Sequence, residues 1–154
     1  MHEPFVDFDF VIPRPPISAH ASASLVVHLA WATRGHAPLL ASSHDGSLAA
    51  ALRASARELA CHVVAVGHTA DEVHVVVRHP PTVCVSELTH LLKMASTEAW
   101  NRRGAPLEWQ SGYQARSCDG ARLGALVDYV RGLRPDLLEE LPDEPFSDQL
   151  AATG

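Results

Sequence analysis

The sequence predicts an α+β domain in which a four-stranded antiparallel sheet carries helices on one face and is followed by a C-terminal helix. Three observations indicate this fold class. Four short segments are rich in β-branched and aromatic residues, other segments repeat apolar residues every three or four positions, and the order along the chain is β-α-β-β-α-β before the last helix. That order is the split β-α-β arrangement of ferredoxin-like domains.

Four segments are predicted as strands: 25–33, 62–68, 72–78 and 108–117. Arg34 and Gly35 close the first strand. Only three residues separate the second and third strands, which leaves room for nothing but a hairpin. Two prolines end the third strand, and Gly112 weakens the prediction for the fourth.

Three segments are predicted as helices: about 47–61, 86–104 and 121–133. Asp45 and Ser47 are candidate caps for the first helix, and Ser86 can cap the second. Gly104 and Pro135 end the second and third helices.

The 154 residues divide into three parts that differ in charge. Residues 1–23 contain a proline cluster and no sustained period, so we expect an extended N-terminal arm with a charge of −2. Residues 24–135 hold the predicted domain, with eleven bases against nine acids. Residues 136–154 form an acidic C-terminal tail with six acids and no base. The net charge of −6 therefore comes from the two ends, and it does not exclude a nucleic-acid partner for the domain.

The sequence predicts a cytoplasmic protein with no membrane association. No apolar run approaches the ~18 residues of a membrane span. The first sixteen residues contain acids where a signal peptide has bases and an apolar stretch. The three cysteines are widely spaced, odd in number and without a CxxC motif, so we expect buried free thiols rather than disulfides or a zinc site.

Glu72 and His74 form the first candidate site. Alternation along the third strand sends Val73, Val75 and Val77 under the helices, and sends Glu72 and His74 to the opposite face, which we expect to stay open. The two polar side chains start roughly 6 to 7 Å apart. Carboxylate and imidazole both ligate Mg, Mn or Zn, but two ligands make a weak site. The spacing by itself favours the simpler interpretation that the two are solvated polar residues.

Tyr129, in the last predicted helix, is the second candidate. A tyrosine on a helix is usually a packing residue whose hydroxyl meets water. A nucleophilic tyrosine would need its target phosphate held by a cation.

Polar residues on the first two helices could follow a DNA backbone, although any amphipathic helix has a solvated polar face, and their spacing favours that interpretation. They are Arg53 and Arg57 on the first helix and Lys93, Thr97, Asn101, Arg102 and Arg103 on the second. Trp31, Trp100 and Trp109 are expected to pack in the core or in a dimer rather than to stack on bases.

Two strings of the sequence, in this order, resemble a known family. Residues 69–77, Thr-Ala-Asp-Glu-Val-His-Val-Val-Val, resemble the segment of the single-tyrosine HUH transposases of small insertion sequences, and of their REP-associated relatives, that usually reads Met-Pro-Asp-His-hydrophobic-His. Residues 109–117, Trp-Gln-Ser-Gly-Tyr-Gln-Ala-Arg-Ser, are similar to that family's Trp-Gln-x-Gly-Tyr-x-x-Phe-Ser run, and Tyr129 follows at the right distance. The segment 27–35 and the helix around Lys93 also fit, so the resemblance spans 24–135.

The resemblance implies a dimer that binds single-stranded DNA, often a hairpin, and a helix tyrosine that attacks a phosphate to form a 5′-phosphotyrosine. It also implies a divalent ion held by two histidines and a helix glutamine. Residue by residue, Tyr129 is then the nucleophile and His74 the second histidine, whereas Glu72 stands at the first histidine and Leu133 at the glutamine. Leu133 has no lone pair, and Asp128 would point about 100° away from Tyr129 on an ideal helix. We therefore expect Mg or Mn to bind weakly.

The sequence, together with its family resemblance, predicts a transposase-like protein that binds single-stranded hairpin DNA and whose metal-dependent cleavage and strand transfer are impaired. Two alternatives stay open: a non-catalytic nucleic-acid-binding protein derived from such a transposase, and an unrelated ferredoxin-like dimer that binds a small ligand. In the dimer, we expect the strand near 109–117 to join a shared sheet, and Tyr129 to lie near Glu72 and His74 of the second copy.

Overall fold

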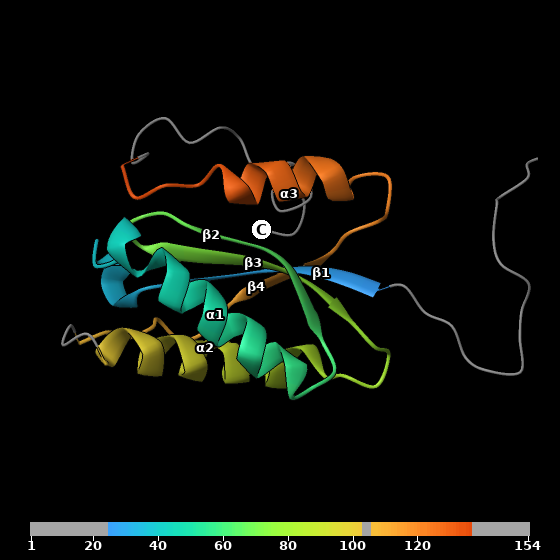
Figure 1. Ribbon diagram of the computed structural model, residues 1–154, viewed down its shortest axis with the longest axis horizontal. Coiled ribbons are helices and arrows are strands. Elements are labelled where there is room, and N and C mark those ends of the chain that lie inside the picture. Colours follow the sequence, from blue (N-terminus) through green and yellow to red (C-terminus); the bar gives the residue numbers. More distant parts are fainter. Residues whose placement is uncertain (1–24, 103–105, 137–154) are drawn as a thin grey trace, which may run out of the picture.

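The computed structural model describes residues 25–102 and 106–136, so the predicted N-terminal arm and nearly all of the acidic tail lie outside the described residues. The described part has three layers (Figure 1). Helices α1 and α2 cover one face of a sheet, and helix α3 lies across the other face. The positions of the layers determine which of the candidate residues can meet.

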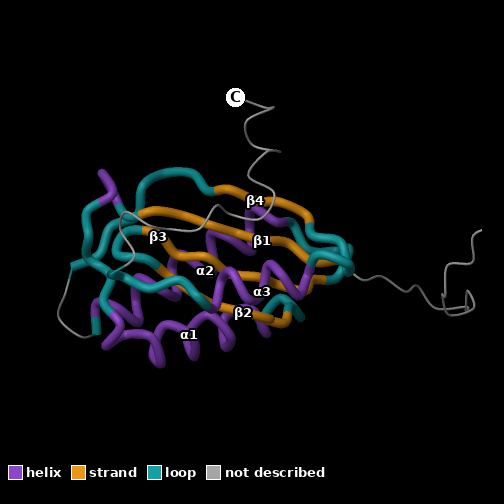
Figure 2. Tube along the Cα trace, turned by 90° about the horizontal axis from the view of Figure 1, so that it is seen from above, coloured by secondary structure: helices purple, strands orange, loops and turns teal. Residues whose placement is uncertain are grey.

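The sheet has four antiparallel strands in the order β2-β3-β1-β4, and Figure 2 shows them side by side. The strands are β1 (Leu25–Ala32), β2 (His62–His68), β3 (Glu72–His79) and β4 (Gln114–Ser117). The long pairing of β1 with β3 forms the centre of the sheet. The predicted α+β class and the four-stranded antiparallel sheet are confirmed.

The fourth strand is shorter than the predicted segment 108–117, because regular pairing begins only at Gln114. Before it, the chain makes one isolated bridge, between Thr33 and Trp109. Gly112 then adopts a φ of 91°, a left-handed conformation that favours glycine. The residues between this bridge and β4 therefore form a loop at the edge of the sheet.

The three helices are α1 (Asp45–Arg57), α2 (Val85–Asn101) and α3 (Leu123–Arg131). Two short 3₁₀ helices, η2 (Arg34–His36) and η3 (Ser42–His44), lie between β1 and α1. Each predicted helix is present, and each begins or ends within a few residues of the predicted bounds.

The predicted helix caps are wrong. The residues at the cap positions of α1 and α2 are His44 and Cys84, and neither makes a side-chain cap hydrogen bond. Asp45 instead lies in the first turn of α1, where its Oδ1 accepts a hydrogen bond of 2.5 Å from Nε2 of His68 at the end of β2. The carboxylate therefore links α1 to the sheet, because a buried imidazole lies within its reach.

The main core lies between the sheet and helices α1 and α2. Val73, Val75 and Val77 are fully buried there, as their alternation predicts. Trp31 and Trp100 are buried in the same core, and Trp109 packs against it, so the expectation of core packing for the tryptophans is confirmed.

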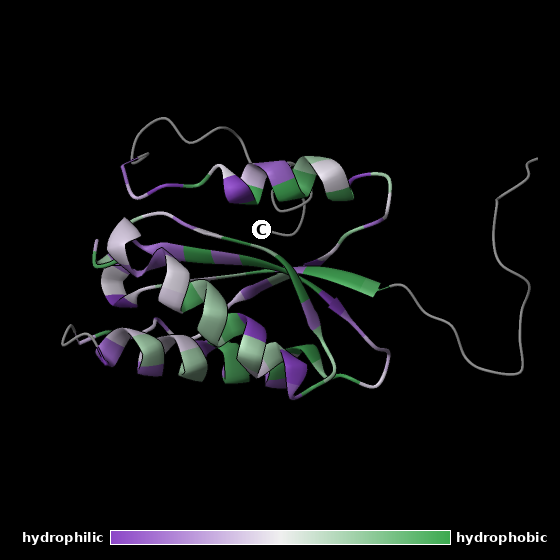
Figure 3. Cartoon of the chain, viewed as in Figure 1, coloured by the Kyte–Doolittle hydropathy of each residue, from purple (hydrophilic) through white to green (hydrophobic). Residues whose placement is uncertain are grey.

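The expectation of an open second sheet face is wrong. Helix α3 covers that face with Leu126 and Val130, which pack with Val76 in a second apolar cluster. Figure 3 shows α3 with apolar and polar residues side by side above mostly apolar strands. Helix α3 is amphipathic, and packing its apolar face on this part of the sheet removes both surfaces from water. That burial stabilises the position of α3. His74 is therefore only 4% exposed.

Gly67 allows α3 to approach β2 closely. A Cβ atom added at Gly67 would lie 1.8 Å from the backbone oxygen of Val130, well inside van der Waals contact. The backbone of α3 thus lies directly on this glycine, and Gly67 itself pairs with His74 across the ladder. The absence of a side chain at Gly67 therefore sets the short distance between α3 and the sheet at the candidate site.

The cysteines differ from the prediction of three buried thiols. All three are free, but only Cys61 is buried, while Cys84 is exposed and Cys118 is intermediate. Burial raises the pKa of the Cys61 thiol, whereas the hydrogen bond with the Ser86 hydroxyl lowers the pKa of Cys84. Cys84 is exposed because it lies in the connection that precedes α2.

Among the helices of the described residues, none is long and apolar enough to cross a membrane.

Candidate functional site

Helix α3 places Tyr129 over the sheet and against His74. The two ring centroids lie 6.1 Å apart and the rings meet edge to face, at 73°. Leu126 and Val130 pack onto the sheet on either side of Tyr129 and so fix the rotation of the helix. Tyr129 is half-buried, and His74 below it is almost completely buried.

His74 has a neighbour at each of its ring nitrogens. Its Nε2 lies 3.4 Å from Oε2 of Glu72, and its Nδ1 lies 2.9 Å from Nε2 of His28. The Glu72 side chain is 39% exposed, so the row of side chains runs from the buried His28 to a carboxylate that reaches solvent. The structure thus brings three of the candidate residues together, Glu72, His74 and Tyr129, and adds His28 to them.

The contact between Tyr129 and His74 is made within one chain. We expected Tyr129 to lie near Glu72 and His74 of a second copy, but α3 folds back on the sheet of its own chain. The connection from β4 to α3 brings the helix directly over this sheet (Figure 1).

The donor set of the site does not fit a firmly held divalent ion. In residues 25–102 and 106–136, no three side chains of the types His, Cys, Asp or Glu lie together as ligands would. Leu133, at the position where the resemblance implies a glutamine, is 8% exposed and apolar. Asp128 is exposed on α3 and completes no such group. Glu72 and His74 alone offer two donors, and those two already contact one another.

Sequence reasoning missed His28. This residue lies in the middle of β1, where it pairs with Val76, two positions from the pair of Ala30 with His74 and so on the same face of the sheet. It is 4% exposed. The signal in the sequence is a histidine within an otherwise apolar strand, but its meeting with His74 depends on the pairing register.

The exposed arginines predicted to contact DNA lie in the opposite layer from Tyr129. Arg53 and Arg57 are exposed on α1, and Arg102 is exposed at the end of α2. The sheet separates this layer from α3 (Figure 1). Arg103 lies outside the described residues.

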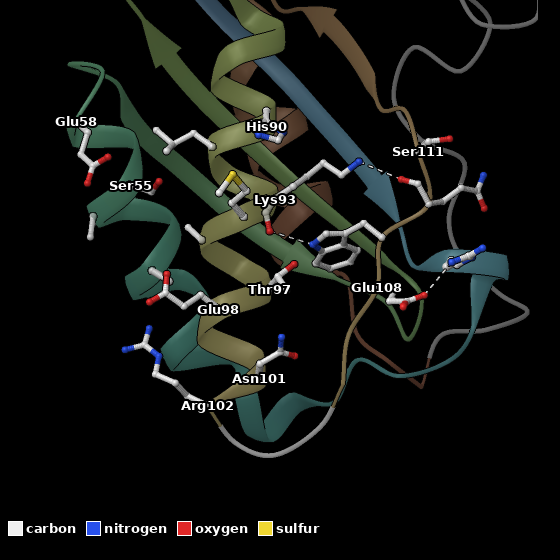
Figure 4. A pocket seen from close by; sticks show the side chains of 18 residues that line it. Ser55, Glu58, His90, Lys93, Thr97, Glu98, Asn101, Arg102, Glu108 and Ser111 are labelled. Atoms are coloured by element: carbon white, nitrogen blue, oxygen red, sulfur yellow. Dashed lines mark hydrogen bonds and ion pairs between the residues drawn. The ribbon is translucent and has the colours of Figure 1, made fainter.

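Lys93 and Asn101 have roles in the fold. The ammonium of Lys93 donates to the backbone oxygens of Gln110 and Gly112, at 3.0 and 3.1 Å, and burial lowers its pKa. Figure 4 shows Lys93 reaching from α2 toward the segment of Ser111. Asn101 accepts a hydrogen bond from the backbone amide of Leu107. Both side chains therefore hold the segment before β4 against α2.

Two cavities border the segment that precedes β4. A groove of about 1210 Å³ runs between α1 and α2 (Figure 4), on the layer away from Tyr129. A smaller pocket of about 360 Å³ lies beside Glu72, between the end of β1 and the loop before β4. Its wall includes Tyr113, which is 43% exposed, and the side chains of Gln110 and Gln114. This second pocket combines an aromatic ring with amide groups next to the candidate site.

Basic residues that were not among the predicted DNA contacts border the α3 side of the sheet. Arg116 on β4 pairs with His28, so it points to the same face as His28. Arg78 follows the alternation of Glu72 and His74 and is exposed near the end of β3. Arg131, at the end of α3, donates to the backbone oxygen of Val64 at 3.4 Å. These positive charges lie on the same side of the sheet as Tyr129.

Comparisons with known proteins identify a family and two similar folds. The profile of the family described as "Transposase IS200 like" matches residues 21–132. The fold is similar to the crystal structure of a candidate transposase from Deinococcus radiodurans R1, with 19% identity, a TM-score of 0.60, and coverage of 79% of this chain and 99% of that one. It is also similar to a REP-associated tyrosine transposase bound to a REP hairpin, with 15% identity, a TM-score of 0.54, and coverage of 74% and 70%. No curated protein matches the sequence.

Proposed function

The chain belongs to the IS200-like transposase family, and on this premise we propose that it binds single-stranded hairpin DNA and that its cleavage by Tyr129 is impaired. The family match over residues 21–132 supports a DNA partner. The similar fold of a transposase that is bound to a REP hairpin supports a hairpin as the form of that DNA. The incomplete donor set around His74 supports the loss of cleavage. Family membership argues against an unrelated small-ligand protein.

We propose that the DNA strand lies on the α3 side of the sheet, beside Glu72 and Tyr129. The pocket next to Glu72 has room for one unpaired base, which could stack on Tyr113 and bond to the amides of Gln110 and Gln114. A base held in a duplex cannot enter such a pocket, so the pocket favours a single strand.

The arginines of the opposite layer would contact the DNA far from Tyr129. Arg53, Arg57 and Arg102 are exposed and can bind phosphates of the hairpin stem. Lys93 and Asn101 form hydrogen bonds with the backbone of the segment before β4, and these bonds favour a structural role over DNA contact.

In the cleavage step, Oη of Tyr129 would lose its proton and attack a phosphorus atom, forming a phosphotyrosine bond, while the P–O3′ bond breaks and the leaving 3′-oxygen takes up a proton. The charge that develops on the phosphate must be stabilised. Leu133 contributes no ligand for a cation, and Glu72 adds a negative charge beside the site. A loss of 3 to 4 kcal/mol of this stabilisation would slow the step by a factor of roughly 100 to 1000.

A denaturing gel of the protein with labelled hairpin oligonucleotide tests this proposal. Wild type, Tyr129→Phe and the double variant Glu72→His with Leu133→Gln are compared in Mg²⁺ and in Mn²⁺. We expect little covalent adduct from wild type, none from Tyr129→Phe, and more from the double variant because it restores two ligand positions. A strong wild-type adduct that Tyr129→Phe abolishes would refute the impairment.

Binding is measured separately by fluorescence anisotropy. We expect the single-stranded hairpin to bind better than a blunt duplex, with an affinity that falls as salt rises. Binding without an adduct from any variant would favour the second candidate function, a non-catalytic DNA-binding protein. Absence of hairpin binding would refute the proposal.

We also propose that the protein forms a homodimer through β4. In the strand order β2-β3-β1-β4 this strand lies at an edge of the described sheet, and a second copy could pair with it. Light scattering of the full chain at tens of micromolar tests this, and a monomer would contradict it.

A further inference from the structure

His28 is a polar residue buried where the fold otherwise packs apolar side chains. Its neighbours on β1 and β3 include Val26 and Val76, which belong to the apolar cluster under α3. His28 is 4% exposed, and its Nε2 lies 2.9 Å from Nδ1 of His74, a hydrogen-bond distance. A buried polar side chain is costly unless it is bonded, so this bond accounts for a histidine at this position.

Among these three side chains, Glu72 has a fixed hydrogen-bonding role, because an ionised carboxylate only accepts. The carboxylate of Glu72 can only accept a hydrogen bond, so Nε2 of His74 must donate to it. In a neutral imidazole the other nitrogen, Nδ1, then has no proton and accepts. With His74 neutral, Nε2 of His28 would be the donor to His74, and the chain of bonds would run from His28 through His74 to Glu72.

We propose that His28 is a positioning residue that holds His74 as an N–H donor toward Glu72. Both nitrogens of His74 are then engaged, one by its proton and the other by the proton of His28. An imidazole ligates a metal ion only through a nitrogen without a proton. An ion at Nε2 of His74 would therefore require both rings to change tautomer, as well as the loss of the bond to Glu72. His28 thus favours a hydrogen-bonded chain at the place where the family resemblance implies a metal.

His28 also fixes the ring that Tyr129 contacts. The edge-to-face contact of His74 with Tyr129 depends on the plane of the His74 ring, which the bonds at its two nitrogens define. Any effect of this ring position on cleavage by Tyr129 rests on the proposed function, whereas the assignment of protons to His28 and His74 does not.

Nuclear magnetic resonance of the ¹⁵N-labelled full chain tests the inference without any activity measurement. In wild type we expect a proton on Nε2 of His28, an unprotonated Nδ1 on His74, and a coupling between these two nitrogens across the hydrogen bond. His28→Phe keeps a planar ring but removes the donor, and His28→Gln places an amide donor at about the position of Nε2. The contact between the rings of His74 and Tyr129 should weaken in His28→Phe and persist in His28→Gln.

The signals of His68, whose ring contacts Asp45 and Thr69, provide an internal control and should stay unchanged in both variants. A proton on Nδ1 of His74 in wild type would overturn the assignment, and so would the absence of the coupling. Equal ring contacts in wild type and His28→Phe would overturn the positioning role. If His28→Phe does not fold, wild type and His28→Gln still decide the question. Failure of hairpin binding by wild type would refute the proposed function and leave the proton assignment standing.

Discussion

Replacing Gly67 by alanine should displace α3 from the sheet, and with it Tyr129 from His74. The added Cβ would lie 1.8 Å from the backbone oxygen of Val130 and 3.3 Å from its Cγ1. The first of these partners is backbone, so no side-chain rotation can relieve the clash. To restore an ordinary contact of about 3.4 Å, α3 must recede by about 1.6 Å at this point.

The expected cost follows from the packing that this movement opens. Val76, Leu126 and Val130 are at most 1% exposed, and a shift of this size partly separates them. Overpacking of this kind costs about 1–3 kcal/mol. For a chain of this length, each kcal/mol lowers the melting temperature by about 2–4 °C, so we expect a decrease of about 2–12 °C.

Gly124→Ala is a matched control, because it makes the same substitution on α3 itself. A Cβ there meets nothing within 4 Å, and alanine is favoured over glycine inside a helix by about 1 kcal/mol. The two variants should therefore shift the melting temperature in opposite directions, as measured by calorimetry. The ring contact between Tyr129 and His74 should weaken only in Gly67→Ala. A Gly67→Ala protein as stable as wild type, with that contact intact, would refute the close packing of α3 on β2.

Lys93→Met should destabilise the protein by about 1–2 kcal/mol and speed hydrogen exchange before β4, because two backbone oxygens lose a charged donor; the exposed Arg53→Met should change stability by less than about 0.5 kcal/mol. Iodoacetamide should modify Cys84 before Cys61, because Cys84 is exposed with a lowered pKa while Cys61 is buried with a raised one, and peptide mass mapping showing equal rates would contradict this. Mn²⁺ should broaden the signals of His74 only weakly at an equimolar concentration, whereas saturation there would show a complete metal site.

The order of elements and the main core could be predicted because they depend on local patterns. The alternation of Val73, Val75 and Val77 marks one buried face of a strand wherever the strand lies. The three-residue link before Glu72 permits only a hairpin, so the pairing of β2 with β3 also follows from the chain. The family resemblance, carried by short strings at fixed positions, singles out Tyr129 and His74, and the fold brings these two side chains together.

The helix caps and the roles of charged side chains could not be predicted in the same way. Lys93 has the spacing of a solvated helix face, yet its ammonium binds backbone oxygens of a loop seventeen and nineteen residues further along the chain. Asp45 has the position of a cap, yet it binds the imidazole of His68 on another element. In both cases the partner is set by tertiary packing, which no local pattern records.

The sequence by itself thus determined the fold class, the buried face of β3 and the family, and its resemblance to the family predicts changed ligand positions at Glu72 and Leu133. Only the tertiary structure decided that α3 lies on the second face of the sheet, and that His28 meets His74 beneath it. The physical reason is that an amphipathic period shows that a helix must bury its apolar stripe but not which surface it covers. A polar residue on an alternating strand has the same pattern whether it faces water or another helix, so its burial and its hydrogen-bond partner emerge only when the layers pack.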